Sequence, residues 1–269
     1  MKQKIIKLLL ILLGVAFLTI MLILPLATVL LYAFRQGWET FLKAVTDEYA
    51  IKALHLTLLI TVITVIVNTA FGIFAAWTIA KFRFRGKQAL ATLIDIPFSI
   101  SPVIAGLVFI LVFGRIGWTY PLLEAWDVKI VFAVPGIVLA TIFVTFPFVS
   151  RELIPLMQSQ GSDEEEAAAL MGAKGLHIFR KVTFPHIKWG LLYGIILCTA
   201  RALGEFGAVS VVSGHLRGKT NTLPLHVEIL FNEFKLTASF AVSSMLVLIA
   251  VIILIFRNIA EYRVKKEGR

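Results

Sequence analysis

The sequence predicts an all-α integral membrane protein with six transmembrane helices and both termini in the cytoplasm. Of its 269 residues, 59% are hydrophobic and only 16% are charged, whereas a water-soluble domain usually carries about a quarter charged residues. The apolar residues fall in long blocks, and about 20 apolar residues in a helix cross the hydrocarbon core of a bilayer. Soluble helices that are apolar on every side are rare, so a water-soluble fold is disfavoured.

Six apolar blocks account for most of the chain, which is treated as one transmembrane domain of residues 1–269. The first block is too long for the core of a signal peptide and lacks a small-residue cleavage site, so it is predicted to be a span. Pro25 is expected to kink it. The six predicted spans cover about residues 5–34, 53–80, 89–114, 130–150, 187–213 and 236–260.

The basic residues orient these spans. Seventeen Lys and Arg lie at the chain ends and in the even-numbered connections, eight lie in the other connections, and Arg201 lies inside a span. Short cytoplasmic loops retain positive charge, so this distribution predicts a multi-pass protein of the bacterial inner membrane with both ends inside the cell. The net charge of +10 therefore reflects topology, and no nucleic-acid-binding signature accompanies it.

The connection 151–186 is the longest predicted cytoplasmic loop, and it contains a short helical pattern. Ser162 and Glu165 have the spacing of a capping box, in a run of acidic residues that suits the positive end of a helix. The alanines that follow are strong helix formers, and Gly172 or Gly175 is expected to end the helix in a left-handed conformation. The loop therefore predicts a short, small-faced helix that another protein surface can approach closely.

This pattern resembles the EAA loop of the permeases of ABC importers. The resemblance rests on Glu166-Ala167-Ala168, on Gly172 after three more residues, and on Val182, Phe184 and Pro185. Val and Phe depart mildly from the apolar residues usual at their positions. The resemblance implies a type I ABC importer permease fold, in which this loop forms a coupling helix that docks on a separate ATPase. The coupling residues that it implies are Glu166, Ala167, Ala168, Gly172, Ala173 and Pro185.

Two further stretches, residues 93–102 and 201–210, resemble the permeases for sulfate and molybdate. The continuation through residues 211–218 looks most like the CysW-type subunits of sulfate/thiosulfate importers. This resemblance implies a CysT-type permease as a heterodimer partner, two copies of an ATPase and an external sulfate-binding protein. The sequence has no phosphate-binding loop of its own, so ATP and Mg are expected on the ATPase and no cofactor on this chain.

Charged residues inside a span are costly and suggest a functional site or a mutual pair. Arg201 and Glu205 are spaced i, i+4 in the fifth predicted span, so they are expected to face the same side and to neutralise each other. One interpretation is an ion pair that fixes helix packing. The other places the pair at the wall of a cavity, where a cation attracts a passing oxyanion and the carboxylate prevents it from being trapped.

Small residues follow in the same span, and they are expected to allow close helix packing, with a polar pore lining as the alternative. Asp95, before Pro97 and Pro102, is expected either to cap a broken helix or to meet Arg201. Asn68 is expected to join helices. The candidate residues of the pathway are Arg201, Glu205, Gly204, Gly207, Ser210, Ser213 and Asp95.

Other functions fit the sequence less well. An intramembrane enzyme needs a nucleophile and a base, or metal ligands, at membrane depth, but the five histidines are scattered and Ser210 and Ser213 have no nearby base in their helix. No catalytic residue and no metal ligand is therefore assigned. An independent channel would leave the EAA-like loop without a role. Within the importer hypothesis, sulfate, thiosulfate, molybdate and tungstate are dianions of the same shape, and a homodimer stays open beside the heterodimer.

Overall fold

The computed structural model describes residues 2–267; residue 1 and residues 268–269, which belong to the predicted domain, lie outside the described part. Within that part the chain is helical and contains no strand, as the predicted all-α class requires. Its helices are α1 Lys2–Ala33, α2 Trp38–Val45, α3 Glu48–Lys81, α4 Lys87–Ser99, α5 Pro102–Phe113, α6 Tyr120–Ala125, α7 Val134–Thr145, α8 Pro147–Gln160, α9 Asp163–Leu170, α10 Gly175–Ile178, the π-helical turn η1 Phe179–Thr183, α11 Phe184–Leu203, α12 Gly207–Val212, α13 Leu223–Asn232 and α14 Leu236–Glu267.

The predicted count of six spans is not confirmed. Four segments within the described residues are long and apolar enough to cross a membrane, namely Ile6–Ala33, Glu48–Lys81, Val134–Gln160 and Leu236–Ile259. The pair α4 and α5 makes a fifth if it is one span, although it bends by 106° at its break. The predicted span 187–213 is not one helix, because α11 ends at Leu203 and α12 begins at Gly207.

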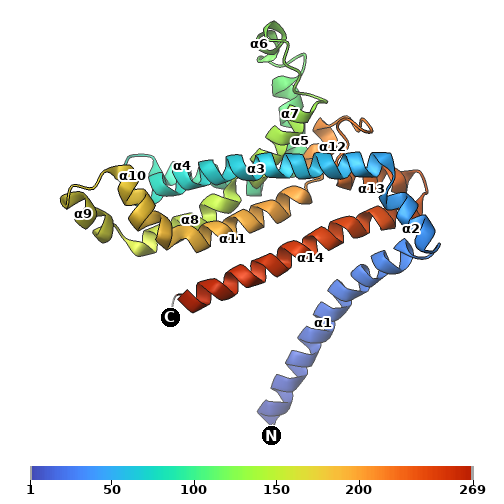
Figure 1. Ribbon diagram of the computed structural model, residues 1–269, viewed down its shortest axis with the longest axis horizontal. Helices are drawn as coiled ribbons and strands as arrows, with labels where there is room; N and C mark the ends of the chain where they lie inside the picture. Colours follow the sequence, from blue (N-terminus) through green and yellow to red (C-terminus); the bar gives the residue numbers. More distant parts are fainter. Residues whose placement is uncertain (1, 268–269) are drawn as a thin grey trace.

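The core of the bundle lies where α3, α8 and α11 pack together. Its buried side chains include Val149, Leu153 and Met157 of α8, which meet Ile187 and Cys198 of α11. In Figure 1 α3 and α11 run side by side along the long axis, with α9 and α10 at one end and α2 and α13 at the other. The loop that contains α9 is therefore at the far end of the bundle from α2 and α13.

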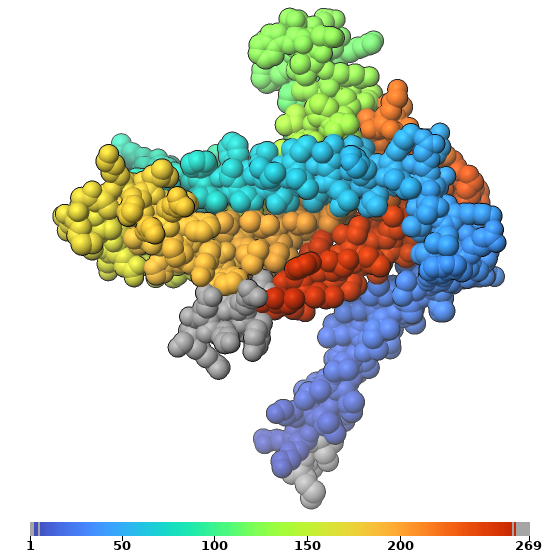
Figure 2. Space-filling view, viewed as in Figure 1, coloured from blue at the N-terminus to red at the C-terminus, as the bar shows by residue number. Residues whose placement is uncertain are grey.

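Two parts of the chain project from this bundle. Helix α1 leaves it near α2, and none of the 18 residues in its most apolar stretch is buried within the chain. The α5–α7 region projects on another side, with α6 at its tip, and Figure 2 shows both projections as separate masses. The apolar side chains of α1, such as Leu13, are exposed, as expected for a helix whose solvent is lipid or another membrane helix.

Asn68 joins helices, as predicted. Its side-chain nitrogen donates hydrogen bonds to the hydroxyl of Thr145 at 2.8 Å and to the carbonyl oxygen of Ile142 at 3.2 Å. Cys198 is fully buried beside this amide, with its sulfur 3.8 Å from the same nitrogen. A polar side chain thus links α3 to α7 in the middle of the apolar bundle.

Gly72 sets the distance between α3 and α8. A Cβ atom at this position would lie 2.6 Å from Cγ1 of Val149 and 3.2 Å from the backbone nitrogen of Ser150. Gly72→Leu is therefore expected to destabilise the protein by about 1–3 kcal/mol, because the side chain is forced into a packed contact. Thermal unfolding in detergent measures this loss. Gly14→Leu is the control, because nothing lies within 4 Å of a Cβ at that position of α1; equal effects of the two changes would contradict the packing role.

Candidate functional site

The loop predicted to be cytoplasmic forms the expected short helix, but without the expected capping box. Ser162 is at the N-cap of α9, and no side chain caps the helix there. Instead the Ser162 hydroxyl donates to Oε1 of Glu166 at 2.5 Å. Glu165, the other predicted member of the box, turns to side chains outside α9. The local pattern fails because the Glu165 carboxylate contacts Lys81 and Thr183, which lie outside α9.

The end of α9 is a Schellman motif centred on Gly172. The N–H of Gly172 donates to the carbonyl of Ala169 at 2.9 Å, and the N–H of Ala173 donates to the carbonyl of Ala168 at 3.1 Å. Gly172 has φ +84°, a conformation that glycine adopts without strain. Of the two predicted glycines, Gly172 ends the helix.

The remaining residues implied in coupling are divided between the surface and the interior. Glu166 and Ala167 are exposed, Ala168 is buried and Ala173 is half-buried. Pro185 is exposed in the first turn of α11, directly after η1. The residues implied in coupling therefore do not all lie on the surface of the chain.

Three large apolar side chains around α9 are highly exposed, and the sequence analysis did not single them out. Leu170, Met171 and Leu176 are each more than 80% exposed. These three residues, called the apolar tip below, flank the turn at Gly172 and stand in a loop with four acidic residues in the first turn of α9. Exposed apolar clusters of this kind mark interaction sites. The sequence signal was that these are the three large apolar residues within positions 161–177, which otherwise hold small, polar and charged residues.

Glu165 is the second feature that sequence reasoning missed. Its Oε1 lies 3.1 Å from Nζ of Lys81, the last residue of α3, and both side chains are largely buried. The Thr183 hydroxyl donates to the same oxygen at 2.6 Å. Lys81 also donates to the carbonyl of Gly161, where α8 ends. By contrast, Glu164 pairs with His186 at 2.9 Å through exposed side chains.

A second candidate site lies at the break between α11 and α12. Nη1 of Arg201 is 2.6 Å from Oε2 of Glu205, which confirms that the two side chains pair. They do not share a continuous helix, because α11 ends at Leu203. The Glu205 side chain is 1% exposed and that of Arg201 is 33% exposed. The second oxygen of Glu205 accepts from the N–H of Ala208 at 2.8 Å, so this carboxylate also caps α12.

The break in α11 lies against the break between α4 and α5. A Cβ atom at Gly207 would lie 3.0 Å from Cβ of Pro102, and one at Gly106 would lie 2.7 Å from the carbonyl oxygen of Ala208. Gly207 thus serves close packing. Gly204, in contrast, is exposed and has only the Ala200 carbonyl near its Cβ position, at 3.8 Å.

The two serines of this region bond to nearby backbone. Ser210 donates to the carbonyl of Gly207 at 2.9 Å, and the fully buried Ser213 accepts from the N–H of His215 at 3.2 Å. The Ser213 hydroxyl therefore does not line an open surface of this chain.

Comparison with known proteins agrees with this arrangement. Residues 68–266 match the family model of the binding-protein-dependent transport system inner membrane component. The chain belongs to this family. The permease is 50% identical over 250 residues to the "Sulfate transport system permease protein CysW" of Synechococcus elongatus, covering 93% of this chain and 87% of the relative. It is 32% identical to the "Sulfate transport system permease protein CysT" of Salmonella typhimurium, covering 92% and 89% of the two chains.

The fold of the permease is that of a known importer. A chain from the crystal structure of a bacterial alginate ABC transporter, in complex with an alginate-bound periplasmic protein, superposes with a TM-score of 0.82. The alignment covers 98% of the permease and 96% of that chain at 18% identity, which shows a shared fold. The permease is thus an inner-membrane component with the type I ABC importer fold.

Asp95 of the permease has neither of its predicted contacts. Its Oδ1 lies 3.4 Å from Nε of Arg151 in α8, not beside Arg201. It also does not cap the break after α4, because Ser101 is the N-cap of α5 and no side chain caps that helix. Arg151 lies over the Phe98 ring as well, 4.8 Å from its centroid. The packing of α4 against α8 brings these residues together, which local sequence spacing did not indicate.

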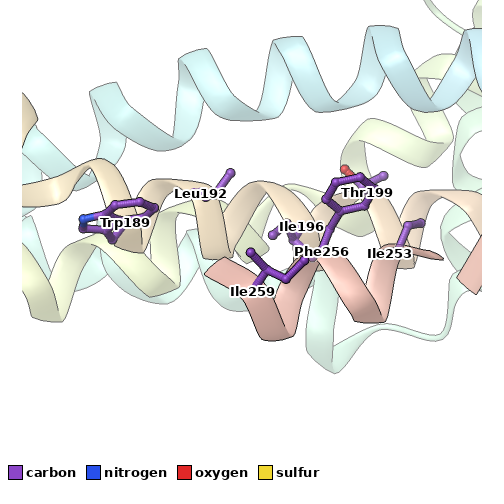
Figure 3. Close-up of a pocket in the computed structure, with 7 residues that line it drawn as sticks. All are labelled: Trp189, Leu192, Ile196, Thr199, Ile253, Phe256 and Ile259. Carbon is purple, nitrogen blue, oxygen red and sulfur yellow. The ribbon is translucent and has the colours of Figure 1, made fainter. Parts of the chain in front are cut away.

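An apolar groove lies between α11 and α14. Figure 3 shows its lining, in which Ile196 and Thr199 of α11 lie beside Phe256 of α14 and Trp189 lies at one end; Thr199 is its one hydroxyl-bearing residue. A groove without charge or multiple polar donors does not suit a dianion. Within the described residues, no three His, Cys, Asp or Glu side chains gather as metal ligands would.

Proposed function

We propose that this permease is one of two membrane subunits of an ATP-driven importer that carries sulfate or thiosulfate into the cell. The observation that carries the coupling role is the apolar tip, three exposed apolar side chains on a short helix at the end of the bundle predicted to be cytoplasmic. An ATPase that binds this tip would remove it from water. This burial stabilises the complex by about 25 cal/mol for each Å² of apolar surface buried. The CysW relative, at 50% identity, supports sulfate over molybdate or tungstate.

The proposed assembly contains a CysT-type permease as heterodimer partner, two copies of an ATPase and an external sulfate-binding protein. The similarity to a CysT permease at 32% identity supports two related but distinct membrane subunits. The family description, a component of binding-protein-dependent transport, supports the external protein. ATP and Mg bind to the ATPase, and this chain needs no cofactor of its own.

In this proposal the Arg201–Glu205 pair weakens the attraction of the pathway for its cargo. A lone arginine at membrane depth would hold a dianion tightly, and transport requires that the site also release it. Oε2 of Glu205, 2.6 Å from the guanidinium, offsets part of that charge, while one third of the Arg201 side chain stays accessible. Arg201 attracts the anion and Glu205 limits its residence.

Removing the apolar tip is expected to abolish binding of the ATPase. The double change Leu170→Ser/Met171→Ser should lower co-purification of the ATPase at least about tenfold, because a few anchoring side chains carry most of the energy of an interface. Phe234→Ser is the matched control, since Phe234 is 89% exposed at the opposite end of the bundle. Equal recovery of the ATPase with the tip variant would contradict the docking role.

Uptake of labelled sulfate by cells that carry the complete importer tests the cargo. Sulfate uptake that requires ATP and is reduced by excess thiosulfate supports the proposal. Stronger competition by molybdate or tungstate than by unlabelled sulfate would overturn the assignment. Anion transport by the purified chain alone would instead indicate an independent channel.

A further inference from the structure

Four acidic residues open α9, and one of them faces the bundle instead of solvent. Glu165 pairs with Lys81 at 3.1 Å, and the two side chains are 18% and 8% exposed. Removing one member of a largely buried ion pair is strongly destabilising, since the other charge is left uncompensated. The exposed pair of Glu164 and His186 lacks this strength. Among the described contacts of α9, the Glu165 pair is therefore its firm attachment to the bundle.

Both members of the pair make one further contact each. Thr183, at the end of η1 and directly before α11, donates to Oε1 of Glu165 at 2.6 Å. Lys81 donates to the carbonyl of Gly161, at the end of α8. Glu165 thus ties α9 to the end of α3 and to the residue before α11, while Lys81 ties α3 to the end of α8.

Aromatic packing also joins the end of α3 to η1. The Trp77 ring in the last turns of α3 lies 5.6 Å from the ring of Phe179 in η1. The two ends of α9, in contrast, are joined to the chain through Gly161 and Gly172, which both have positive φ. These turns set how α9 joins the chain, and the Glu165 contacts tie it to the bundle.

We propose that Glu165 is the positioning residue that transmits movement of α9 to α3 and α11. This inference rests on the proposed function, because it requires an ATPase that moves α9. When the ATPase displaces the apolar tip, the pair with Lys81 carries the displacement into α3 and the bond from Thr183 carries it into α11. Without Glu165, α9 loses its side-chain contacts with Lys81 and Thr183, and the membrane helices do not follow its movement.

The test uses the assembled importer in proteoliposomes, with sulfate uptake and ATP hydrolysis measured on the same preparation. Glu165→Gln keeps an acceptor for Thr183 and removes the charge that holds Lys81. Uptake per ATP hydrolysed is expected to fall about fivefold or more, the range of a coupling free energy, while co-purification of the ATPase is retained. Asp163→Asn is the control, since Asp163 is an exposed acidic residue in the same turn.

Exchange of the two charges separates transmission from simple damage to the loop. Lys81→Glu alone should also uncouple transport, and Lys81→Glu with Glu165→Lys should restore much of the uptake per ATP. Three results would overturn the inference: an unchanged ratio in Glu165→Gln, a matching loss of ATPase binding, or no rescue by the exchange. Failure of the proposed function is visible separately, because the unmodified permease would then neither bind an ATPase nor require ATP for uptake.

Discussion

Glu205→Ala is expected to abolish transport and to destabilise the permease more than any other single change at the broken helix. The change removes both the partner of Arg201 and the acceptor for the Ala208 N–H. Loss of one member of a buried pair costs about 3–5 kcal/mol, and the partial exposure of Arg201 places this pair toward the lower end. Sulfate uptake and thermal unfolding of the purified complex measure the two effects.

A double-mutant cycle of Arg201→Ala and Glu205→Ala tests the pairing. The double variant should be less damaged than the sum of the single variants, with a coupling energy of about 1 kcal/mol or more. Glu205→Gln should lie between the unmodified protein and Glu205→Ala, because the amide oxygen can still accept from Ala208. Additive losses would show that the two side chains act independently despite their 2.6 Å contact.

Gly172→Val is expected to uncouple transport from ATP hydrolysis. The left-handed conformation costs a residue with a Cβ about 1–2 kcal/mol, and more for a β-branched side chain. The Schellman motif would rearrange and redirect the apolar tip, so uptake per ATP should fall at least about tenfold. Membrane insertion should be unaffected, because Gly172 is outside the apolar helices.

Three related variants show whether conformation is the cause. Nothing lies within 4 Å of a Cβ at Gly172, so steric overlap is not the expected source of damage. Gly172→Asn should retain more coupling than Gly172→Val, because Asn tolerates φ near +84° better than β-branched residues do. Gly175→Ala should behave as the unmodified protein, since Gly175 lies in the same loop with no positive φ. Normal coupling in Gly172→Val would refute the role of this turn.

Features set by neighbouring residues could be predicted from the sequence. The acidic residues after Ser162 and the glycine after the alanines mark where α9 begins and ends, and short-range hydrogen bonds form its C-terminal turn. The pairing of Arg201 with Glu205 also followed from spacing, although the end of α11 between them did not. At that break Gly207 packs against Pro102 of α5, which is a tertiary contact that local spacing does not indicate.

Contacts between distant segments could not be predicted. Asp95 finds Arg151 because α4 packs against α8, and no local rule relates the two positions. Glu165 does not form the expected capping box; it pairs instead with Lys81, at the end of α3. The six apolar blocks were visible in the composition, and Pro97 and Pro102 indicated a broken helix, but the sequence did not indicate the 106° bend between α4 and α5.

The single thiol of the permease has a practical consequence. Cys198 is shielded between α3, α7 and α11, out of reach of water-borne maleimide reagents while the bundle is intact. A cysteine introduced at an exposed position such as Lys174 would therefore take up a fluorophore or spin label alone, without prior removal of the native residue. Labelling of the unmodified chain would in turn report that the bundle has opened.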